Sequence, residues 1–378
     1  TFYSSYFAMD ITNPDAPKLL WSFSSSNLGL TTSAPAVVRV NPAADAKASN
    51  TNAKWYMVVG SGPTGYDASV VQSAKVFVVD LATGPGSGNS LVTSYSVGSW
   101  NSYIGDITAF DRDLDYRHDV VYFGRVIHDG ALPWRGKIYR LTMGAGGATA
   151  KFGTVTSPTQ WGIASGSARV PTEMLDTFVS GAEMGPVATA PSVTMDDAAN
   201  VWVFAGSGRY YSGTDKTDVS TQYFVGLKDS VLNAGCNQSA GALNCMDNDL
   251  VDVSNATVCV VGVGDCGQAS GTNQVSGVTG ATTFTGLIGL VQSKDGWVTK
   301  LVEPGSSGPP VILPAAIGER VVSSPTVFGG VVFFPTFIPT NDICTSSGTS
   351  RLWALFYKTG SAYQEPIIGT ATSGANQT

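Results

Sequence analysis

A three-part unit of short strands returns along the chain, and this repetition limits the folds that the chain can adopt. The first part of the unit is a strand preceded by Ser or Thr, then Ala or Ser, then Pro. The second part is an apolar strand that usually ends in Gly. The third part is a strand of alternating apolar and polar residues that leads into a turn. The unit occurs four times, with a partial fifth copy at Tyr6–Thr12. The clearest matches are 33–38, 57–62, 76–84, 120–124, 137–142, 189–193, 203–208, 323–327, 331–334 and 352–360.

This order of short strands and turns predicts sheets built from hairpins. Its return along the chain predicts radial repetition of antiparallel blades. We therefore expect an all-β fold, a modified β-propeller with long inserted loops, in preference to a large β-sandwich. The scarcity of Lys and Glu argues against long helices, whose exposed faces need those residues. One short helix is predicted over Pro171–Glu183, where four apolar residues share one face.

The domain organisation expected is a single domain over residues 1–378, because no Pro-rich linker divides the chain. The largest interruption of the blades, about 228–280, is rich in Asn, Gly, Ser and Asp and holds four of the five Cys. A long excursion from a compact domain usually has a function or needs tying down. We expect the cysteines to hold this inserted loop in place.

The cysteines of that loop are Cys236, Cys245, Cys259 and Cys266. They form no CxxC pair and have no His beside them, so a zinc site is not expected. The first two and the last two could each close a small loop by a disulfide, as in proteins outside the reducing cytosol. The connectivity stays open, and Cys344 is left unpaired or joined to a partner elsewhere.

The charge and hydropathy of the chain exclude two classes of partner. The chain has 21 Lys and Arg against 28 Asp and Glu, for a formal charge of −7, and no basic cluster. Such a chain cannot displace counterions from nucleic acid. No apolar run approaches the roughly 18 residues of a membrane span. Since the sequence lacks an initial Met and a signal peptide, we interpret it as the C-terminal part of a longer exported precursor.

The strongest chemical signal is an acidic segment between two expected strands. Carboxylates stand at its positions 1, 3, 5 and 9, which are Asp111, Asp113, Asp115 and Asp119, and position 7 is Arg117. Winding of such a loop turns these side chains and the backbone carbonyl of Arg117 toward one centre. Hard oxygen ligands at this spacing suit Ca²⁺ better than Mg²⁺ or Zn²⁺. The segment therefore predicts a calcium site.

Two departures from the EF-hand loop weaken the predicted site. Position 6 is Tyr116 instead of Gly, and position 12 is Tyr122 instead of a bidentate Glu. Without that Glu, the calcium dissociation constant is expected on the order of 10⁻⁶ to 10⁻³ M. The alternative is a solvated acidic turn, but four close carboxylates without a cation repel one another.

Other candidate sites are weaker. Asp247, Asp249 and Asp252, with Asn248, could hold a second ion, but their spacing is loose and a solvated loop is favoured. His118 is expected to face away from the calcium ligands, at the surface. Neither His118 nor the other histidine, His128, has a neighbouring Cys or Ser arranged for nucleophilic catalysis. Gly60-Ser61-Gly62 and Gly206-Ser207-Gly208 are interpreted as strand-ending turns, since no Lys or helix start follows them.

The chain closely resembles the C-terminal domain of the PilY-type proteins of type IV pili. The resemblance covers nearly the whole chain and rests on a few segments. These are Tyr6–Pro14 with Leu19-Leu20-Trp21, Asp111–Asp119, Gly206–Tyr211 with Ser220–Gly226, and Glu319–Pro325 with Gly348–Leu352 and Thr359-Gly360.

The resemblance implies a propeller with blades like those of quinoprotein dehydrogenases, in a non-enzymatic, secreted adhesin and biogenesis factor at the pilus tip. It implies that Ca²⁺, held by the aspartates of the acidic segment, tunes pilus extension and retraction, attachment and twitching motility. The expected partners are minor pilins and the pilus filament, reached through a larger upstream region, and a host or abiotic surface.

Two other functions are possible on the same fold. A quinoprotein-like oxidoreductase is disfavoured, because the sequence has no adjacent Cys-Cys pair and no acidic base stands beside the acidic segment. Fold alone would not carry that chemistry. A glycan-binding lectin would need an exposed aromatic platform, which a sequence does not reveal.

Overall fold

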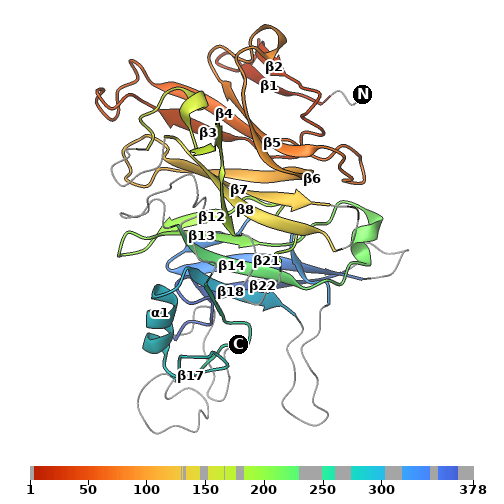
Figure 1. The fold of residues 1–378 in the computed structure, drawn as a ribbon, viewed down its shortest axis with the longest axis vertical. Helices are drawn as coiled ribbons and strands as arrows, with labels where there is room; N and C mark the ends of the chain where they lie inside the picture. Colours follow the sequence, from red (N-terminus) through yellow and green to blue (C-terminus); the bar gives the residue numbers. More distant parts are fainter. Residues whose placement is uncertain are drawn as a thin grey trace. The chain divides into compact units, whose positions relative to one another are not determined.

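The computed structural model describes residues 4–128, 130, 133–144, 152–165, 167–175, 183–229, 249–259, 274–302, 317–340 and 348–364. They form two compact units, each considered by itself. The first unit contains the described residues up to 175 and Pro186–Pro191, and the second contains 183–185, Ser192–Asp229 and the described residues from 249 onward. Apart from one α-helix and three short 3₁₀ turns, the regular structure of these residues is β-strand (Figure 1). The predicted all-β class is confirmed.

A hairpin of β1 (Tyr6–Asp10) and β2 (Lys18–Phe23) precedes the main sheet of the first unit. Two of its side chains fix it to that unit. The indole N–H of Trp21 donates to the carbonyl of Leu81 at 3.0 Å, and the hydroxyl of Tyr6 donates to the carbonyl of Ser33 at 2.6 Å. The partial copy predicted at Tyr6–Thr12 thus contributes a strand that pairs with β2, outside the larger sheets.

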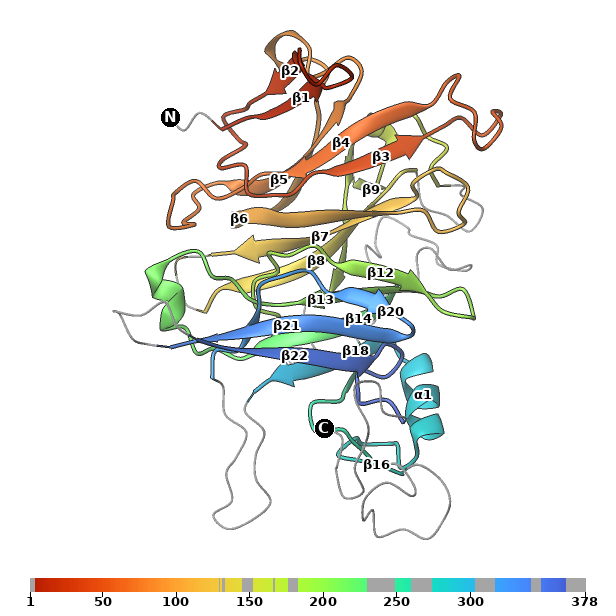
Figure 2. The same ribbon diagram turned by 180° about the vertical axis from the view of Figure 1, so that it is seen from behind.

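One long strand joins two blade-like meanders in the first unit. β6 (Thr93–Phe110) pairs with β5 up to Asn101 and with β7 from Ser102 onward, so the two meanders share it. The order of the resulting sheet is β11-β8-β7-β6-β5-β4-β3, and neighbouring strands are antiparallel (Figures 1 and 2). The other strands of this sheet are β3 (Ala36–Val40), β4 (Lys54–Gly60), β5 (Ser73–Asp80), β7 (Val120–Ile127), β8 (Arg135–Thr142) and β11 (Thr172–Leu175). A separate hairpin is formed by β9 (Ile163–Ser165) and β10 (Ala168–Val170).

Two glycines of the apolar strands, Gly60 at the end of β4 and Gly124 within β7, have a packing role. A Cβ at Gly60 would lie 2.3 Å from Cβ of Ile104, and a Cβ at Gly124 would lie 2.3 Å from Cγ1 of Val187. Both distances are far below van der Waals contact, so only Gly admits these neighbours. The recurring Gly of the sequence unit therefore marks places where a neighbouring segment packs directly on the strand.

The second unit repeats the antiparallel pattern in two sheets. The strands of the larger sheet have the order β12-β13-β14-β18-β15, with only β15 parallel to its neighbour. They are β12 (Ser192–Met195), β13 (Val201–Gly206), β14 (Gln222–Asp229), β15 (Leu250–Asp252) and β18 (Gly296–Leu301). The smaller sheet consists of β19 (Arg320–Val321), β20 (Thr326–Phe328), β21 (Val331–Pro339) and β22 (Gly348–Phe356).

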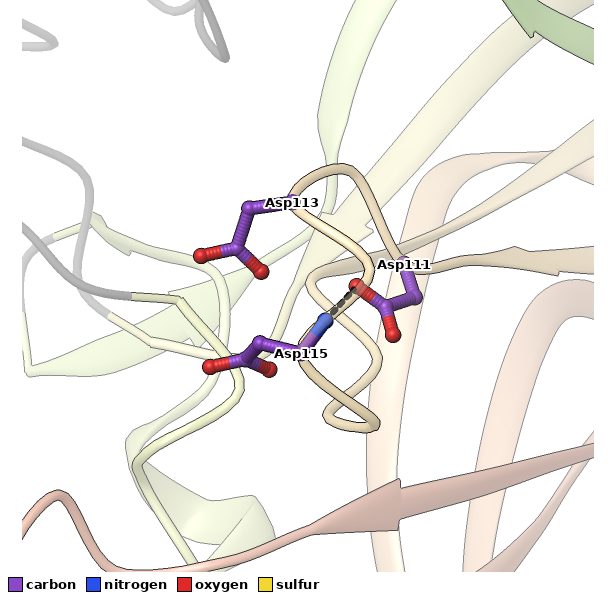
Figure 3. Close-up of side chains that lie close together, drawn as sticks. All are labelled: Asp111, Asp113 and Asp115. Carbon is purple, nitrogen blue, oxygen red and sulfur yellow. Dashed lines mark hydrogen bonds between the residues drawn. The ribbon is translucent and has the colours of Figure 1, made fainter. Parts of the chain in front are cut away.

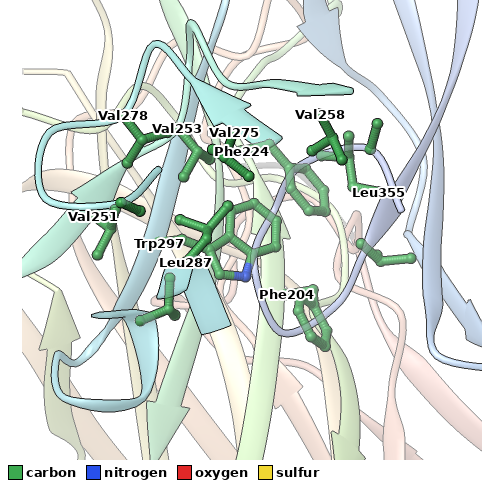
Figure 4. Close-up of a cluster of buried hydrophobic side chains, with 14 of the residues drawn as sticks. Phe204, Phe224, Val251, Val253, Val258, Val275, Val278, Leu287, Trp297 and Leu355 are labelled. Atoms are coloured by element: carbon green, nitrogen blue, oxygen red, sulfur yellow. The ribbon is translucent and has the colours of Figure 1, made fainter. Parts of the chain in front are cut away.

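An aromatic core holds the second unit together. Trp297, Phe204 and Phe224 are completely buried among valine and leucine side chains (Figure 4). The rings of Phe224 and Phe334 stack at 3.7 Å between centroids, which joins β14 of the larger sheet to β21 of the smaller one. Burial of such large side chains contributes roughly 1.5–3 kcal/mol each.

The helix predicted over Pro171–Glu183 is wrong in its first part. Thr172–Leu175 is strand β11, which pairs with β8, while 176–182 lie outside the described residues. Pairing with a sheet edge outweighs the local helical pattern there.

The α-helix that the structure does contain, α1 (Phe284–Gln292), was not predicted. It begins at Thr283, whose side chain accepts the N–H of Gly286, and it buries Phe284, Leu287 and Val291. Gly286 and Gly289 weaken its local helical signal, since Gly is poor in helix interiors. Tertiary packing of the apolar face compensates.

The inserted loop predicted at about 228–280 contains regular structure where it is described. Strand β14 extends to Asp229, β15 joins the larger sheet, and β16 (Thr257–Cys259) pairs with β17 (Gln274–Ser276). The single domain predicted over 1–378 stays a prediction. No helix in the described part of the chain is both long and apolar enough to cross a membrane.

Candidate functional site: an acidic loop and its pocket

The acidic segment forms the connection between β6 and β7. Phe110 and Val120 face each other as the last pair of the β6–β7 ladder, and the N–H of Asp119 donates to the carbonyl of Phe110 at 2.9 Å. Both ends of the loop are therefore fixed by a sheet, whereas an EF-hand loop joins two helices. The two strands expected on either side of the acidic segment are confirmed.

Three of the four predicted carboxylates come together. Asp111, Asp113 and Asp115 each offer an oxygen, and these oxygens all lie within 4.8 Å of one another (Figure 3). Asp111 also folds the loop back on itself, since its Oδ1 accepts the N–H of Asp115 at 3.1 Å and its Oδ2 accepts the N–H of Tyr116 at 2.8 Å. The geometry fits a hard divalent cation, which carboxylate oxygens bind well.

The backbone of the loop winds through the left-handed region twice. Leu114 at position 4 has φ 53° and Tyr116 at position 6 has φ 67°. That conformation costs roughly 1–2 kcal/mol for an L-residue. Tyr116 thus adopts the turn that Gly makes easy in an EF-hand, and its side chain is exposed. The bonds that Asp111 accepts help to offset the strain.

The fourth predicted ligand, Asp119, is buried in the wall beside the cluster. Its Oδ2 accepts the N–H of Arg112 at 2.7 Å, and it is not one of the three residues whose oxygens converge. Burial raises the pKa of Asp119 to about 7 in spite of that bond, and the charges of Asp113, Asp111 and Asp115 add to the shift. Burial, followed by the charges of Asp115 and Asp111, also raises the pKa of Asp113. A divalent cation at this position would relieve both effects.

Arg117 contributes more than the backbone carbonyl assigned to it from the sequence. Its side chain is buried, with Nη1 2.7 Å from Oδ2 of Asp115. Its Nη2 donates to the carbonyls of Pro42 at 3.2 Å and Asp45 at 3.0 Å. The acidic loop is therefore attached to the connection between β3 and β4. Five residues, Asp111, Asp113, Asp115, Asp119 and Arg117 through its carbonyl, remain the predicted calcium ligands.

The predicted surface position of His118 is wrong. His118 is half-buried, its Nδ1 accepts the N–H of Arg39 at 3.0 Å, and its own N–H donates to the carbonyl of Arg39 at 2.8 Å. The guanidinium of Arg39 in turn donates to the carbonyls of Tyr116, Lys47 and Ser49. Arg39 and the β3–β4 connection could not be linked to the site from sequence, because about 80 residues separate them from it.

These contacts leave a pocket of about 200 Å³ over the acidic loop. The residues that line it are Ala43, Lys47, Arg112, Asp113, Asp115, Arg117, Asp119, Phe152 and Thr154. Two of the three converging aspartates and the fourth carboxylate therefore face a space shared with basic side chains.

The other candidate residues make structural contacts. Asp249 pairs with Lys294, and Asp252 pairs with Lys300 at 3.0 Å, so these carboxylates bind lysines. Asp247 and Asn248 lie outside the described residues, as do all the cysteines except Cys259, which ends β16. The predicted disulfides stay a prediction.

Two motifs that carried the family resemblance meet in the second unit. Arg209 pairs with Asp215 at 2.7 Å, both completely buried. Arg320 is also buried and donates to the carbonyls of Arg209 at 3.1 Å and Asp215 at 2.7 Å. Gly208, two residues after the end of β13, lies against Arg320, where a Cβ on the glycine would come within 2.6 Å of the Cβ of Arg320. These residues stabilise a turn of the second unit.

The comparisons with known proteins agree with the resemblance. No protein-family model matches the chain. Two relatives from Xylella fastidiosa strain Temecula1, each named type IV pilus biogenesis factor PilY1 homolog, are 25% and 24% identical over 95% and 98% of this chain. The chain spans 21% and 24% of their lengths.

A solved structure shares the fold. The crystal structure of the Pseudomonas aeruginosa PilY1 C-terminal domain covers 94% of this chain with a TM-score of 0.60 and 19% sequence identity, and 65% of that chain is matched. Sequence and fold together confirm the resemblance to the PilY-type C-terminal domain.

Proposed function

We propose that this chain is a calcium-binding C-terminal domain of a type IV pilus biogenesis factor and tip adhesin, and that it acts without catalysis. The observation that carries the proposal is the similarity to two PilY1 homologs over nearly the whole chain. Their names describe a biogenesis factor rather than an enzyme. The convergence of Asp111, Asp113 and Asp115 supports the calcium part of the proposal.

The proposed setting is outside the cell, at the pilus tip of a bacterium. Minor pilins and the pilus filament are the proposed partners, reached through sequence upstream of this chain, together with a host or abiotic surface. The acidic charge of the chain speaks against nucleic acid as a partner.

Calcium would act on the connection between β3 and β4. A ligand shifts an equilibrium only when it binds two states with different affinity. Arg117 and Arg39 attach the acidic loop to that connection, so ordering of the loop by an ion would also order residues 42–49. In this way one ion can bias a surface segment, and through it the readiness of the pilus to stay extended.

The experiment replaces the predicted calcium-binding aspartates in the full-length protein. Asp111→Ala and Asp119→Ala should abolish calcium binding measured by calorimetry and change surface piliation and twitching, without preventing secretion. Asp15→Ala, in the exposed turn between β1 and β2, is the matched control. Surface pili are counted at several calcium concentrations, with and without the retraction motor.

The outcomes separate two roles for the ion. If piliation and motility match wild type at every calcium concentration although calcium binding is lost, calcium only stabilises the loop and the regulatory proposal fails. If Asp111→Ala retains wild-type affinity, the site lies elsewhere.

A further inference from the structure

The pocket over the acidic loop contains basic side chains that calcium binding does not need. Lys47, Arg112 and Arg117 line it together with Asp113, Asp115 and Asp119. Lys47 is exposed, and no hydrogen bond or ion pair occupies its ammonium group among the described residues. A cation site built only to hold Ca²⁺ would gain nothing from the positive charges of Lys47 and Arg112, whereas Arg117 is bonded to Asp115 of the loop.

The guanidinium groups are also incompletely paired. Nε of Arg112 and Nε of Arg117 are buried and have no acceptor in the described part of the chain. Arg117 itself is only 5% exposed. A buried donor without an acceptor costs about 1–3 kcal/mol. The charge of Arg117 is already paired with Asp115, whereas no hydrogen bond or ion pair of the Arg112 side chain occurs in the described part of the chain. Lys47 and Arg112 therefore keep positive charge at the pocket wall that the described residues do not pair.

An ion in the loop would make the pocket attractive to an anion. With a divalent cation bound, it and the three basic side chains outweigh the four carboxylates by one charge. The loop also has Tyr122 where an EF-hand supplies its bidentate carboxylate, and Tyr122 is completely buried in β7. The ion therefore lacks one carboxylate that an outside ligand can supply.

The rest of the lining suits a sugar ring. Phe152 and Thr154 add an apolar and a hydroxyl-bearing residue to a lining that is otherwise mostly charged. The cavity volume of about 200 Å³ is many times the roughly 10–15 Å³ that a cavity needs, by the same measure, to hold one water. A carboxylate attached to a pyranose ring would fit both the charge and the mixed surface of the wall.

We propose that the pocket binds the carboxylate of an acidic sugar, a uronic acid, which bridges the loop-bound calcium and the side chains of Lys47 and Arg112. The proposal rests on the calcium site proposed above and gives it a ligand for surface attachment. Arg117 stands behind the ion as part of the wall and holds Asp115 in place.

The test measures binding of methyl glucuronoside to the calcium-saturated chain by calorimetry and ligand-observed NMR. Methyl glucoside, which lacks the carboxylate, and N-acetyl-aspartate amide, an acidic peptide mimic, are the comparison ligands. The uronoside should bind at least about tenfold more tightly than either and should be released by chelator. Equal binding of the glucoside, tighter binding of the peptide mimic, or binding that survives chelator would overturn the proposal.

Variants of the rim separate this proposal from the calcium site. Lys47→Ala and Arg112→Gln should each weaken uronoside binding about tenfold, while calcium affinity is retained or rises because a positive charge is removed. Lys18→Ala, on exposed β2, should change neither. Wild-type uronoside affinity in both rim variants, or loss of calcium binding in them, contradicts the assigned roles. Calcium binding without any uronoside binding leaves the calcium proposal intact and rejects this one, whereas absence of calcium binding rejects both.

Discussion

The backbone N–H of Arg39 donates to Nδ1 of His118 at 3.0 Å, and the N–H of His118 donates to the carbonyl of Arg39 at 2.8 Å. The edge strand β3 is thereby joined to the end of the acidic loop by two hydrogen bonds. One of them is a backbone bond, and the imidazole side chain of His118 accepts the other. Nδ1 accepts this bond only while it carries no proton.

We therefore predict that His118→Leu destabilises the protein by about 1–2 kcal/mol, because the N–H of Arg39 loses its acceptor. Calcium affinity should fall as the loop loses order. His118→Asn, which keeps an acceptor at a similar position, should recover most of both effects. Urea denaturation and calcium calorimetry measure them. Equal stability of the Leu and Asn variants would refute the role of this bond.

Strain at position 6 of the loop leads to a second prediction. Tyr116 has φ 67° and an exposed side chain, so its ring contributes little while its Cβ strains the turn. Tyr116→Gly should be about 1 kcal/mol more stable than Tyr116→Ala, which keeps the Cβ. Tighter calcium binding should accompany the gain. The comparison uses melting temperatures with and without calcium, and an Ala variant as stable as Gly would show that the loop is unstrained.

How much of the site could be predicted depends on sequence distance. The aspartates of the loop lie within nine residues, and their alternate spacing was enough to identify Asp111, Asp113 and Asp115 as a cluster. Lys47 and Arg39 reach the same loop only because β3 lies in the sheet that contains β6 and β7. Such long-range contacts leave no local pattern.

The fold shows the same contrast. Strand alternation and the strand-ending glycines are local signals, and they identified most of the blade strands. The segment 172–175 has helical spacing, yet β8 provides a sheet edge that it pairs with. Conversely, Phe284–Gln292 contains two glycines but forms a helix, because Phe284 and Leu287 pack into the hydrophobic core.

Removal of calcium should lower stability in a concentration-dependent way. Binding to the folded state alone adds about 2.7 kcal/mol when free calcium is 100 times the dissociation constant. We expect the melting temperature to rise with calcium and to return to its starting value when chelator is added. Mg²⁺ at equal concentration should have a much smaller effect, since it prefers fewer protein ligands and keeps its waters. A melting temperature that does not change with calcium would contradict the proposed site.

The cysteines give a fourth prediction, which concerns the exported location. At least one disulfide should form among Cys236, Cys245, Cys259 and Cys266. Mass spectrometry of a non-reduced digest of protein purified from the cell exterior should identify the linked peptides. Four free thiols there would contradict both the tying of the inserted loop and the argument for export.

The buried Arg320 supports the last prediction. Its guanidinium donates to the carbonyls of Gly318, Arg209, Asp215 and Asp218. Arg320→Met would leave these carbonyls without a partner, so the free energy of unfolding should fall by more than about 3 kcal/mol. Arg320→Lys should recover only part of the loss, since a single ammonium group cannot reach every acceptor of the planar guanidinium. Calcium affinity of the folded fraction should stay unchanged, because Arg320 belongs to the second unit and the acidic loop to the first. Urea denaturation with calcium calorimetry tests both statements, and a Met variant as stable as wild type would show that this motif of the family resemblance has a role other than stabilising the turn.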